Sequence, residues 1–217
     1  MTQETATGIV LRTRPLTETS LIVRWLTAHL GVISTVAKGA RRPKSPFRGQ
    51  IDLFYVADFS FIRSRRSDLH TLSEVKLIAT HADLRPELAY VEQAAYCTKL
   101  IEQATEPETP LPGLFERFSS MLDQIPKQPA QAQMIFGFEI KLLADLGLQP
   151  DLDQSHLSAR SRELLEAFLE LGWPEIADTK MTSIQSTELR QFLHGFLVYN
   201  LDRIPKGRAR ALAGGPF

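Results

Sequence analysis

Five cations and no acidic residue lie between residues 36 and 49 of this 217-residue chain, in the stretch VAKGARRPKSPFRG. Cations spaced along a chain can neutralise successive phosphate groups, and glycines let backbone N–H groups approach phosphate oxygens. The two glycines and two prolines of the same stretch predict a loop rather than a strand or a helix. We therefore expect a polyanion-binding loop, the basic loop, whose cations are Lys38, Arg41, Arg42, Lys44 and Arg48.

Two other features of the sequence suit a nucleic acid. Phe47, within the basic loop, is the aromatic ring that we expect to stack on a base. Arg65 and Arg66, with Arg63 beside them, form a second basic cluster in a turn between two expected strands. If both clusters share one face of the protein, they border a groove for a nucleic-acid backbone. A flexible, solvated connection is the other interpretation of the basic loop.

Side chains with catalytic or metal-binding chemistry are sparse. The single cysteine, Cys97, excludes internal disulfides and a cysteine-based zinc site, and it falls in a helical pattern where a buried thiol is ordinary. Asp151, Asp153 and His156 form one compact group of two acids and a histidine. Metal ligands on a loop could have this pattern, but helix capping and loop polarity explain these residues. There is no phosphate-binding glycine motif and no nucleophile motif. We expect a binding protein with no catalytic residue, no metal and no cofactor.

The zero net charge conceals two unlike parts of the chain. Residues 1–80 hold 12 Lys or Arg and 6 Asp or Glu, whereas residues 81–217 hold 13 and 19. Such segregation would steer a polyanion to the first part and away from the second. The alternative is that this difference in charge arose by chance and that both parts have ordinary solvated surfaces. Without a membrane-length apolar run or a signal-peptide pattern, we expect a cytoplasmic protein that does not enter a membrane.

The hydrophobic periodicity also changes along the chain. Five short β-rich runs precede residue 80 and leave no room for crossover helices, which predicts a small antiparallel barrel or sandwich. They cover residues 8–15, 20–27, 31–38, 53–62 and 68–78. A period of 3.6 residues then predicts five helices, at 87–104, 113–125, 130–147, 158–172 and 186–202. We expect two domains, residues 1–80 and 81–217.

Several polar and glycine residues are expected to mark the ends of these helices. Gly147 terminates the third helix, and Ser158 is the expected N-cap of the fourth. For the fifth helix the N-cap is Ser186 or Thr187, with Glu188 in the first turn.

The sequence resembles the RecO family of DNA repair proteins, which are recombination mediators. The resemblance is carried by GIVLRTRPLTETSLIV, LTAHLGVISTVAKGARRPKS and FRGQIDLF in the first part, and by FEIKLLADLGLQPDL at residues 138–152. It implies an α+β, two-domain chain: a five-stranded antiparallel oligonucleotide-binding (OB) barrel followed by an all-α domain. By position, the basic loop falls in the family's DNA-binding region, with Arg14 and Arg12 on the neighbouring strand.

The resemblance also implies an activity and partners. It implies binding of single- and double-stranded DNA, annealing of complementary strands, and cooperation with RecR in loading RecA. It further implies contact with the C-terminal tail of the single-stranded-DNA-binding protein.

Two departures from the family pattern change these expectations. Many relatives carry four zinc-ligand cysteines in the region that here reads DLDQSHLSARSRELL, so we expect no zinc. A basic residue often precedes the F-E pair, but Phe136 and Gly137 stand there. An acidic tail that ends in apolar residues would then use the C-terminal cations Arg203, Lys206, Arg208 and Arg210.

Three other classes of function remain open from the sequence. An RNA-binding barrel would use the same cations, and a protein adaptor would direct the basic loop at an acidic partner. A nuclease would need paired carboxylates and a metal.

Overall fold

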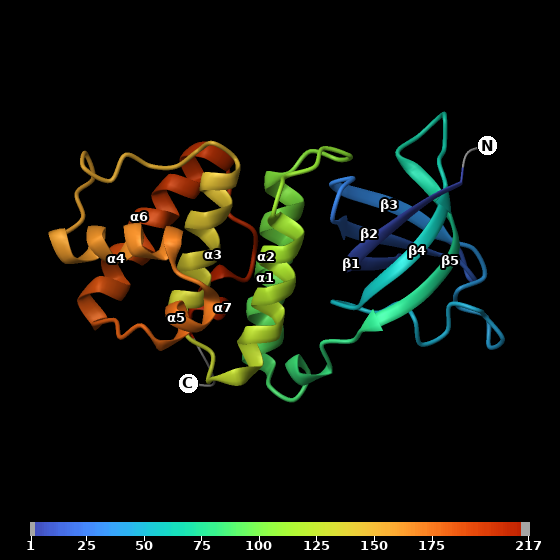
Figure 1. Cartoon of the computed structure of the whole chain (residues 1–217), viewed down its shortest axis with the longest axis horizontal. Helices are drawn as coiled ribbons and strands as arrows, with labels where there is room; N and C mark the ends of the chain where they lie inside the picture. The colour runs from blue at the N-terminus through green and yellow to red at the C-terminus, as the bar shows by residue number, and fades with distance from the viewer. Residues whose placement is uncertain (1–2, 214–217) are drawn as a thin grey trace. The chain divides into compact units, whose positions relative to one another are not determined.

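The computed structural model describes residues 3–213, which divide into two compact units. The barrel unit contains the described residues through Ala82 together with Thr105–Ser119, and the helical unit contains Asp83–Ala104 and the described residues from Ser120 on. Figure 1 shows the strands of the first unit and the helices of the second. The expected combination of a five-stranded barrel and a helical region is confirmed.

The barrel is closed, with its strands in the order β1-β2-β3-β5-β4. The strands are β1 (Gln3–Pro15), β2 (Leu21–Thr27), β3 (Val32–Ala37), β4 (Val56–Ile62) and β5 (Leu69–Ala79). Four neighbouring pairs are antiparallel, whereas β3 and β5 are parallel. A ring with an odd number of strands cannot alternate direction all the way round, so one parallel pair is required for closure.

β1 links both sides of the barrel because it is long enough to pair with two strands. Its first residues pair with β4 and its last residues pair with β2, and the register shifts between Val10 and Arg12. Such a bulge bends the strand and lets it follow the curved wall. As a result, the two ends of β1 lie at different ends of the barrel.

The barrel core is aromatic. The rings of Trp25 and Phe59 stack with their centroids 4.2 Å apart, and the Trp25 indole N–H donates to the Thr35 hydroxyl at 2.9 Å. The buried indole therefore keeps its hydrogen bond, which would cost free energy if it were lost. Phe61 packs in the same cluster.

The described residues after the barrel strands form the five expected helices and two that were not expected. The helices are α1 (Leu88–Ala104), α2 (Leu114–Gln124), α3 (Ala132–Asp145), α4 (Ala159–Glu170), α5 (Trp173–Asp178), α6 (Ser183–Leu201) and α7 (Arg208–Ala213). α2 begins in the segment grouped with the barrel. The unexpected α5 and α7 each have only 6 residues, too few to show a 3.6-residue period. No helix in the described part of the chain is long and apolar enough to cross a membrane.

The helix ends agree with the sequence in two places and differ in a third. Gly147 follows α3 with φ +70°, and the Leu148 N–H reaches the Leu143 carbonyl at 2.8 Å, as a terminating glycine motif requires. Ser158 is the N-cap of α4. The expected N-cap of the last long helix was wrong: α6 begins earlier, because Thr182 and Gln185 form a reciprocal capping box.

Candidate nucleic-acid interface

The basic loop lies in the connection from β3 to β4, which is a series of turns without a helix. Backbone hydrogen bonds close successive turns: Arg42 N–H to Gly39 O at 3.0 Å, Ser45 to Arg42 at 3.1 Å and Arg48 to Ser45 at 3.2 Å. Gly39 has φ +72°, a left-handed conformation that costs glycine no strain. These bonds hold the cations on an ordered turn structure.

All five cations of the basic loop have exposed side chains, and so does Arg14. Among residues 3–213, no carboxylate forms a salt bridge with any of the five. The acidic helices therefore do not neutralise the loop in the described part of the chain. Uncompensated like charges repel one another, and an incoming polyanion relieves that repulsion.

The turn between β1 and β2, residues 16–20, is attached to the basic loop. The backbone N–H of Arg41 donates to the Thr19 carbonyl at 3.0 Å, and its guanidinium Nη1 donates to the Thr17 carbonyl at 3.3 Å. Arg48 Nη1 similarly donates to the Pro43 carbonyl at 3.2 Å. Both arginines keep their charge and remaining donors, and their orientation is partly set before any ligand binds.

Arg14 lies at the same end of the barrel as the basic loop. Pro15, the last residue of β1, pairs with Leu21, which in turn pairs with Ala37, the residue before Lys38. The strand register therefore places Arg14 next to the loop.

Phe47 lies in a different environment from the one expected. Only 7% of its surface is exposed, and its ring packs into the barrel core with Trp25 and Phe59. The prediction that this ring stacks on a base is wrong, because the ring is buried in the described structure. Burying an apolar ring in the barrel core is more favourable than leaving it exposed to water. The ring anchors the basic loop to the core.

The second basic cluster is separate from the basic loop. Arg65 and Arg66 are exposed in the turn between β4 and β5. That turn follows Ile62, which pairs with Gln3 at the start of β1, whereas the basic loop lies near the end of β1. Figure 1 also shows the β3–β4 and β4–β5 connections at different ends of the barrel. The two basic clusters therefore lie at different ends of the barrel, and the described residues do not bring them together.

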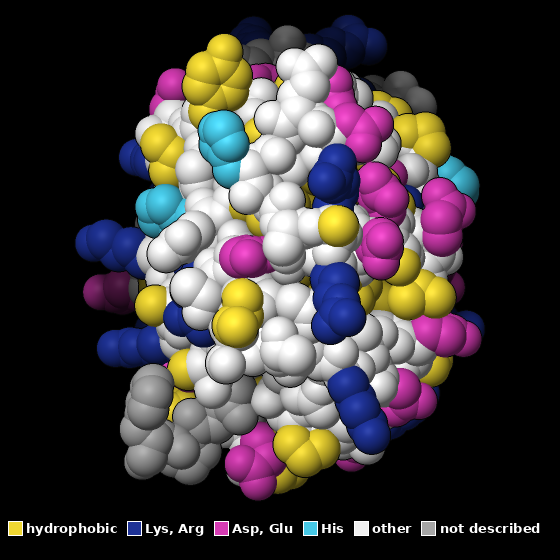
Figure 2. All heavy atoms as spheres, turned by 90° about the vertical axis from the view of Figure 1, so that its left-hand side faces the viewer, with side chains coloured by type: hydrophobic (Ala, Val, Ile, Leu, Met, Phe, Trp, Pro, Cys, Tyr) yellow, Lys and Arg dark blue, Asp and Glu magenta, His cyan; other side chains and the backbone are white. Residues whose placement is uncertain are grey.

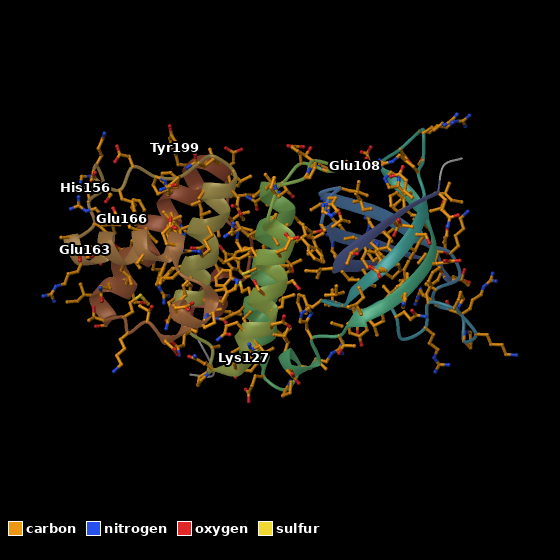
Figure 3. All side chains as sticks on the ribbon, in the orientation of Figure 1. Glu108, Lys127, His156, Glu163, Glu166 and Tyr199 are labelled. Atoms are coloured by element: carbon orange, nitrogen blue, oxygen red, sulfur yellow. The ribbon has the colours of Figure 1, made fainter. Side chains whose placement is uncertain are left out.

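Arg63 belongs to a polar network that the sequence did not reveal. Its guanidinium makes two hydrogen bonds to the Glu4 carboxylate, at 2.6 and 2.9 Å, and it also contacts Glu108. The buried His70 lies 3.0 Å from Glu108 through Nε2 and accepts the Ser64 N–H at Nδ1. Figure 3 labels Glu108 beside the barrel. The network fixes the 105–119 segment to the barrel and removes Arg63 from the cations available to a ligand.

The barrel offers a nucleic acid no exposed aromatic surface. Every Phe and Trp of residues 3–82 is at least nine-tenths buried, and the half-buried Tyr55 packs against the core. The face of β2 and β3 that points away from the core is buried as well, at Ile22, Leu26, Val32 and Val36. OB barrels often bind oligonucleotides on this face. The five exposed cations of the basic loop lie instead at one end of the barrel.

The C-terminal cations have unequal environments. Arg208 is only 6% exposed, and its guanidinium makes a two-pronged contact with the buried Glu139, at 2.7 and 2.8 Å. The Tyr96 hydroxyl donates to the same carboxylate at 2.5 Å. Burial is the largest single effect and acts to lower the pKa of Arg208, but the hydrogen bonds and charge of Glu139, together with Tyr96, outweigh it and raise the pKa. The prediction that Arg208 binds a partner is wrong, because its guanidinium is buried and paired with Glu139 inside the helical unit.

The other three C-terminal cations remain at the surface. Arg210 lies 3.7 Å from Glu92, while Arg203 and Lys206 form no salt bridge within residues 3–213. The same segment borders a largely apolar hollow of about 710 Å³. Its lining residues include Arg190, His194, Ile204, Pro205 and Leu212. Figure 2 shows one face of the helical unit, where Lys and Arg side chains lie among Asp and Glu.

The compact group of two acids and a histidine at residues 151–156 lies in a loop. Asp151 accepts the backbone N–H of Asp153, and Asp153 pairs with Arg162 at 3.2 Å. His156 is exposed. Within the described residues, no group of three or more His, Cys, Asp or Glu side chains is arranged to hold a metal ion.

The strand order defines an OB-type barrel, here joined to a helical unit, and its unpaired cations suit a polyanion. Residues 1–81 match the family model described as Recombination protein O N terminal, and residues 88–158 match Recombination protein O C terminal. The chain belongs to the RecO family, which is named for DNA repair and recombination.

The individual relatives agree with this assignment. The protein named DNA repair protein RecO from Bacillus subtilis (strain 168) is 34% identical over 146 residues, 67% of this chain and 56% of the relative. Its namesake from Rhodopirellula baltica is 33% identical over 156 residues, 72% of this chain and 58% of the relative. The chain therefore spans a little more than half the length of these curated relatives.

Proposed function

We propose that this protein is a recombination mediator that binds single- and double-stranded DNA, anneals complementary strands and, with RecR, helps to load RecA. It acts by binding and not by catalysis. The observation that carries the proposal is the basic loop: five exposed cations without a salt bridge to any described carboxylate, on a barrel of the RecO family.

The proposed mechanism begins with phosphate neutralisation. Lysine and arginine side chains displace condensed counterions from DNA, and release of these ions drives association. Lys38, Arg41, Arg42, Lys44 and Arg48 are the proposed contacts, and Arg14 extends them along β1. If about five phosphates of a single strand are neutralised, log affinity falls against log salt with a slope of roughly −3.5.

The buried rings support annealing in particular. A protein that stacks bases on exposed aromatic rings competes with base pairing for the same faces of the bases. Here Trp25, Phe47, Phe59 and Phe61 are all in the core, so none of these rings competes with base pairing. Neutralised backbones also repel each other less. Both effects favour pairing of a second strand with a strand held on the basic loop.

The second basic cluster has a secondary place in the proposal. Arg65 and Arg66 are exposed at the other end of the barrel, so they do not contact the short stretch of DNA that the basic loop holds. They contact DNA in the proposal when a longer strand extends around the barrel.

The helical unit supplies the partner contacts in this proposal. The C-terminal tail of the single-stranded-DNA-binding protein is acidic and ends in apolar residues. The apolar hollow beside Ile204 and Pro205 suits such an end, while Arg203 and Lys206 attract the acidic part. Arg210, which is 80% exposed despite its contact with Glu92, is a further candidate. RecR is proposed as a partner on family membership, without an assigned surface.

The test is strand annealing on DNA coated with the single-stranded-DNA-binding protein. We compare the native chain with the R41E/R42E/K44E variant, which reverses three charges of the basic loop. A loss of DNA affinity of at least about 100-fold is expected, because reversed charges repel phosphates instead of attracting them.

A matched control reverses three exposed cations of the helical unit, Lys127, Arg160 and Lys180, to glutamate. This variant has the same net charge as the first, and we expect it to bind and anneal DNA nearly as well as the native chain. Equal losses in both variants would show that only net charge matters and would refute the loop assignment. Tighter binding of transfer RNA than of DNA would favour an RNA-binding protein, and no binding to either would favour an adaptor.

A further inference from the structure

Leu16 is a large apolar side chain exposed at the edge of the proposed DNA site. It has 47% of its surface exposed and lies in the β1–β2 turn, the turn that is attached to Arg41 of the basic loop. Leu53 and Ile78 are the other large apolar side chains exposed among the described residues of the barrel strands and loops. Of the three, only Leu16 lies in a turn that Arg41 contacts, through the carbonyls of Thr17 and Thr19.

The turn that carries Leu16 is held by hydrogen bonds between its own residues. Pro15 restricts the backbone before it, and the Leu16 N–H donates to the Ser20 carbonyl at 2.9 Å. The Thr17 hydroxyl accepts the backbone N–H groups of Thr19 at 3.3 Å and Ser20 at 3.1 Å. A side chain on such a preorganised turn loses little conformational entropy when it contacts a ligand.

The charge of the turn indicates which part of DNA it meets. Residues 16–20 contain no cation, and they include the exposed acid Glu18. A carboxylate repels phosphates, so this turn does not serve the DNA backbone. An apolar side chain beside a phosphate-binding loop can instead contact the face of an unstacked base, since every base of a single strand presents such a face.

We propose that Leu16 contacts an unpaired base of the bound strand and gives the basic loop a preference for single-stranded over double-stranded DNA; this inference rests on the proposed function. In a single strand a base can turn outward onto Leu16, whereas in a duplex the bases are stacked and paired. The contact is therefore lost when the strand pairs. Annealed product then binds more weakly than the single strand from which it formed.

The experiment compares Leu16→Ala with the matched Leu53→Ala, since Leu53 has a similar exposure of 40%. Three probes of equal length are titrated: an oligothymidylate, the same backbone with abasic sites, and a duplex. Leu16→Ala is expected to weaken oligothymidylate binding about fivefold, because three apolar carbons lose a partly buried contact. Binding of the abasic strand and the duplex stays unchanged, and so does the salt slope. Leu53→Ala leaves all three affinities unchanged.

The results separate this inference from the function on which it rests. Equal losses on the abasic strand, no loss on oligothymidylate, or the same loss from Leu53→Ala would each overturn the role of Leu16. Leu16→Phe offers a larger apolar surface and is expected to bind oligothymidylate at least as tightly as the native chain, which a purely structural role would not produce. If R41E/R42E/K44E still binds DNA, the proposed function itself fails.

Discussion

The basic loop and the C-terminal segment, residues 201–213, are both rich in cations, yet the fold uses those cations differently. In the basic loop all five cations are exposed and none forms a salt bridge with a described carboxylate. In the C-terminal segment, Arg208 is buried against Glu139 and Tyr96, and Arg210 lies near Glu92. The comparison teaches that a cation buried against a carboxylate of the same chain, as Arg208 is, is no longer available to a ligand.

The largest expected effect on stability comes from removing the buried cation of the C-terminal segment. Arg208→Ala leaves the Glu139 carboxylate buried without its cation, so we expect the free energy of unfolding to fall by about 3–5 kcal/mol. Lys38→Ala, at an exposed position, should change it by less than about 0.5 kcal/mol. Urea denaturation followed by circular dichroism measures both. Equal midpoints for the two variants would contradict the distinction between the segments.

A smaller effect on stability tests how the basic loop is anchored to the barrel core. Phe47→Leu loses part of a buried ring, so we expect the free energy of unfolding to fall by about 1–2 kcal/mol. DNA affinity, measured by fluorescence anisotropy on the folded variant, should stay within about twofold of the native value, since the ring lies in the core and not on a base. A large loss of affinity with unchanged stability would restore the stacking role.

The smallest effect concerns a cation of the barrel that is already paired. The hydrogen bond from Arg63 lowers the pKa of Glu4 from its ordinary value of 4.5, against a smaller opposing effect of burial. The pair therefore stabilises the fold above pH 4.5, and this contribution is lost as the pH falls through the lowered pKa. Because both groups are partly exposed, we expect Glu4→Gln to cost at most about 1 kcal/mol at pH 7.

That cost should shrink as the pH falls below 4.5, because the native Glu4 becomes protonated as the pH falls through its lowered pKa. Thermal unfolding of both chains between pH 3 and pH 7 measures the difference. A difference in stability that does not vary with pH would show that the charge of Glu4 contributes nothing, and that its contact with Arg63 is only steric.

Much of the fold could be predicted because its signals are local. The five strands and the five longer helices follow from hydrophobic periods, and Gly147 and Ser158 end or begin helices as expected. The parallel β3–β5 pair could not be read from a run of residues, since it follows from closing the whole ring. The start of α6 was misplaced because Ser, Thr and Gln residues offer several caps in succession.

The candidate site was predicted in part. The cations of the basic loop and their exposure follow from a loop sequence that has no acid in it. Phe47 and Arg208 were misassigned because each finds its partner far along the chain, in the barrel core and at Glu139. For Arg208 the sequence held one signal. Glu139 lies within the apolar run of α3, and this position indicates a buried carboxylate that needs a cation.

By itself the sequence determined the β-then-α order of the chain, the local positions of its elements and a loop with five uncompensated cations, because each depends on neighbouring residues. Only the tertiary structure decided which cations stay free, which rings enter the core and which loops meet. Those outcomes depend on burial and on charge pairs between distant residues, as in the contacts of Arg63 with Glu4 and of Arg208 with Glu139. A charge is removed from use when folding brings its counter-charge within hydrogen-bonding distance, and no local pattern records that encounter.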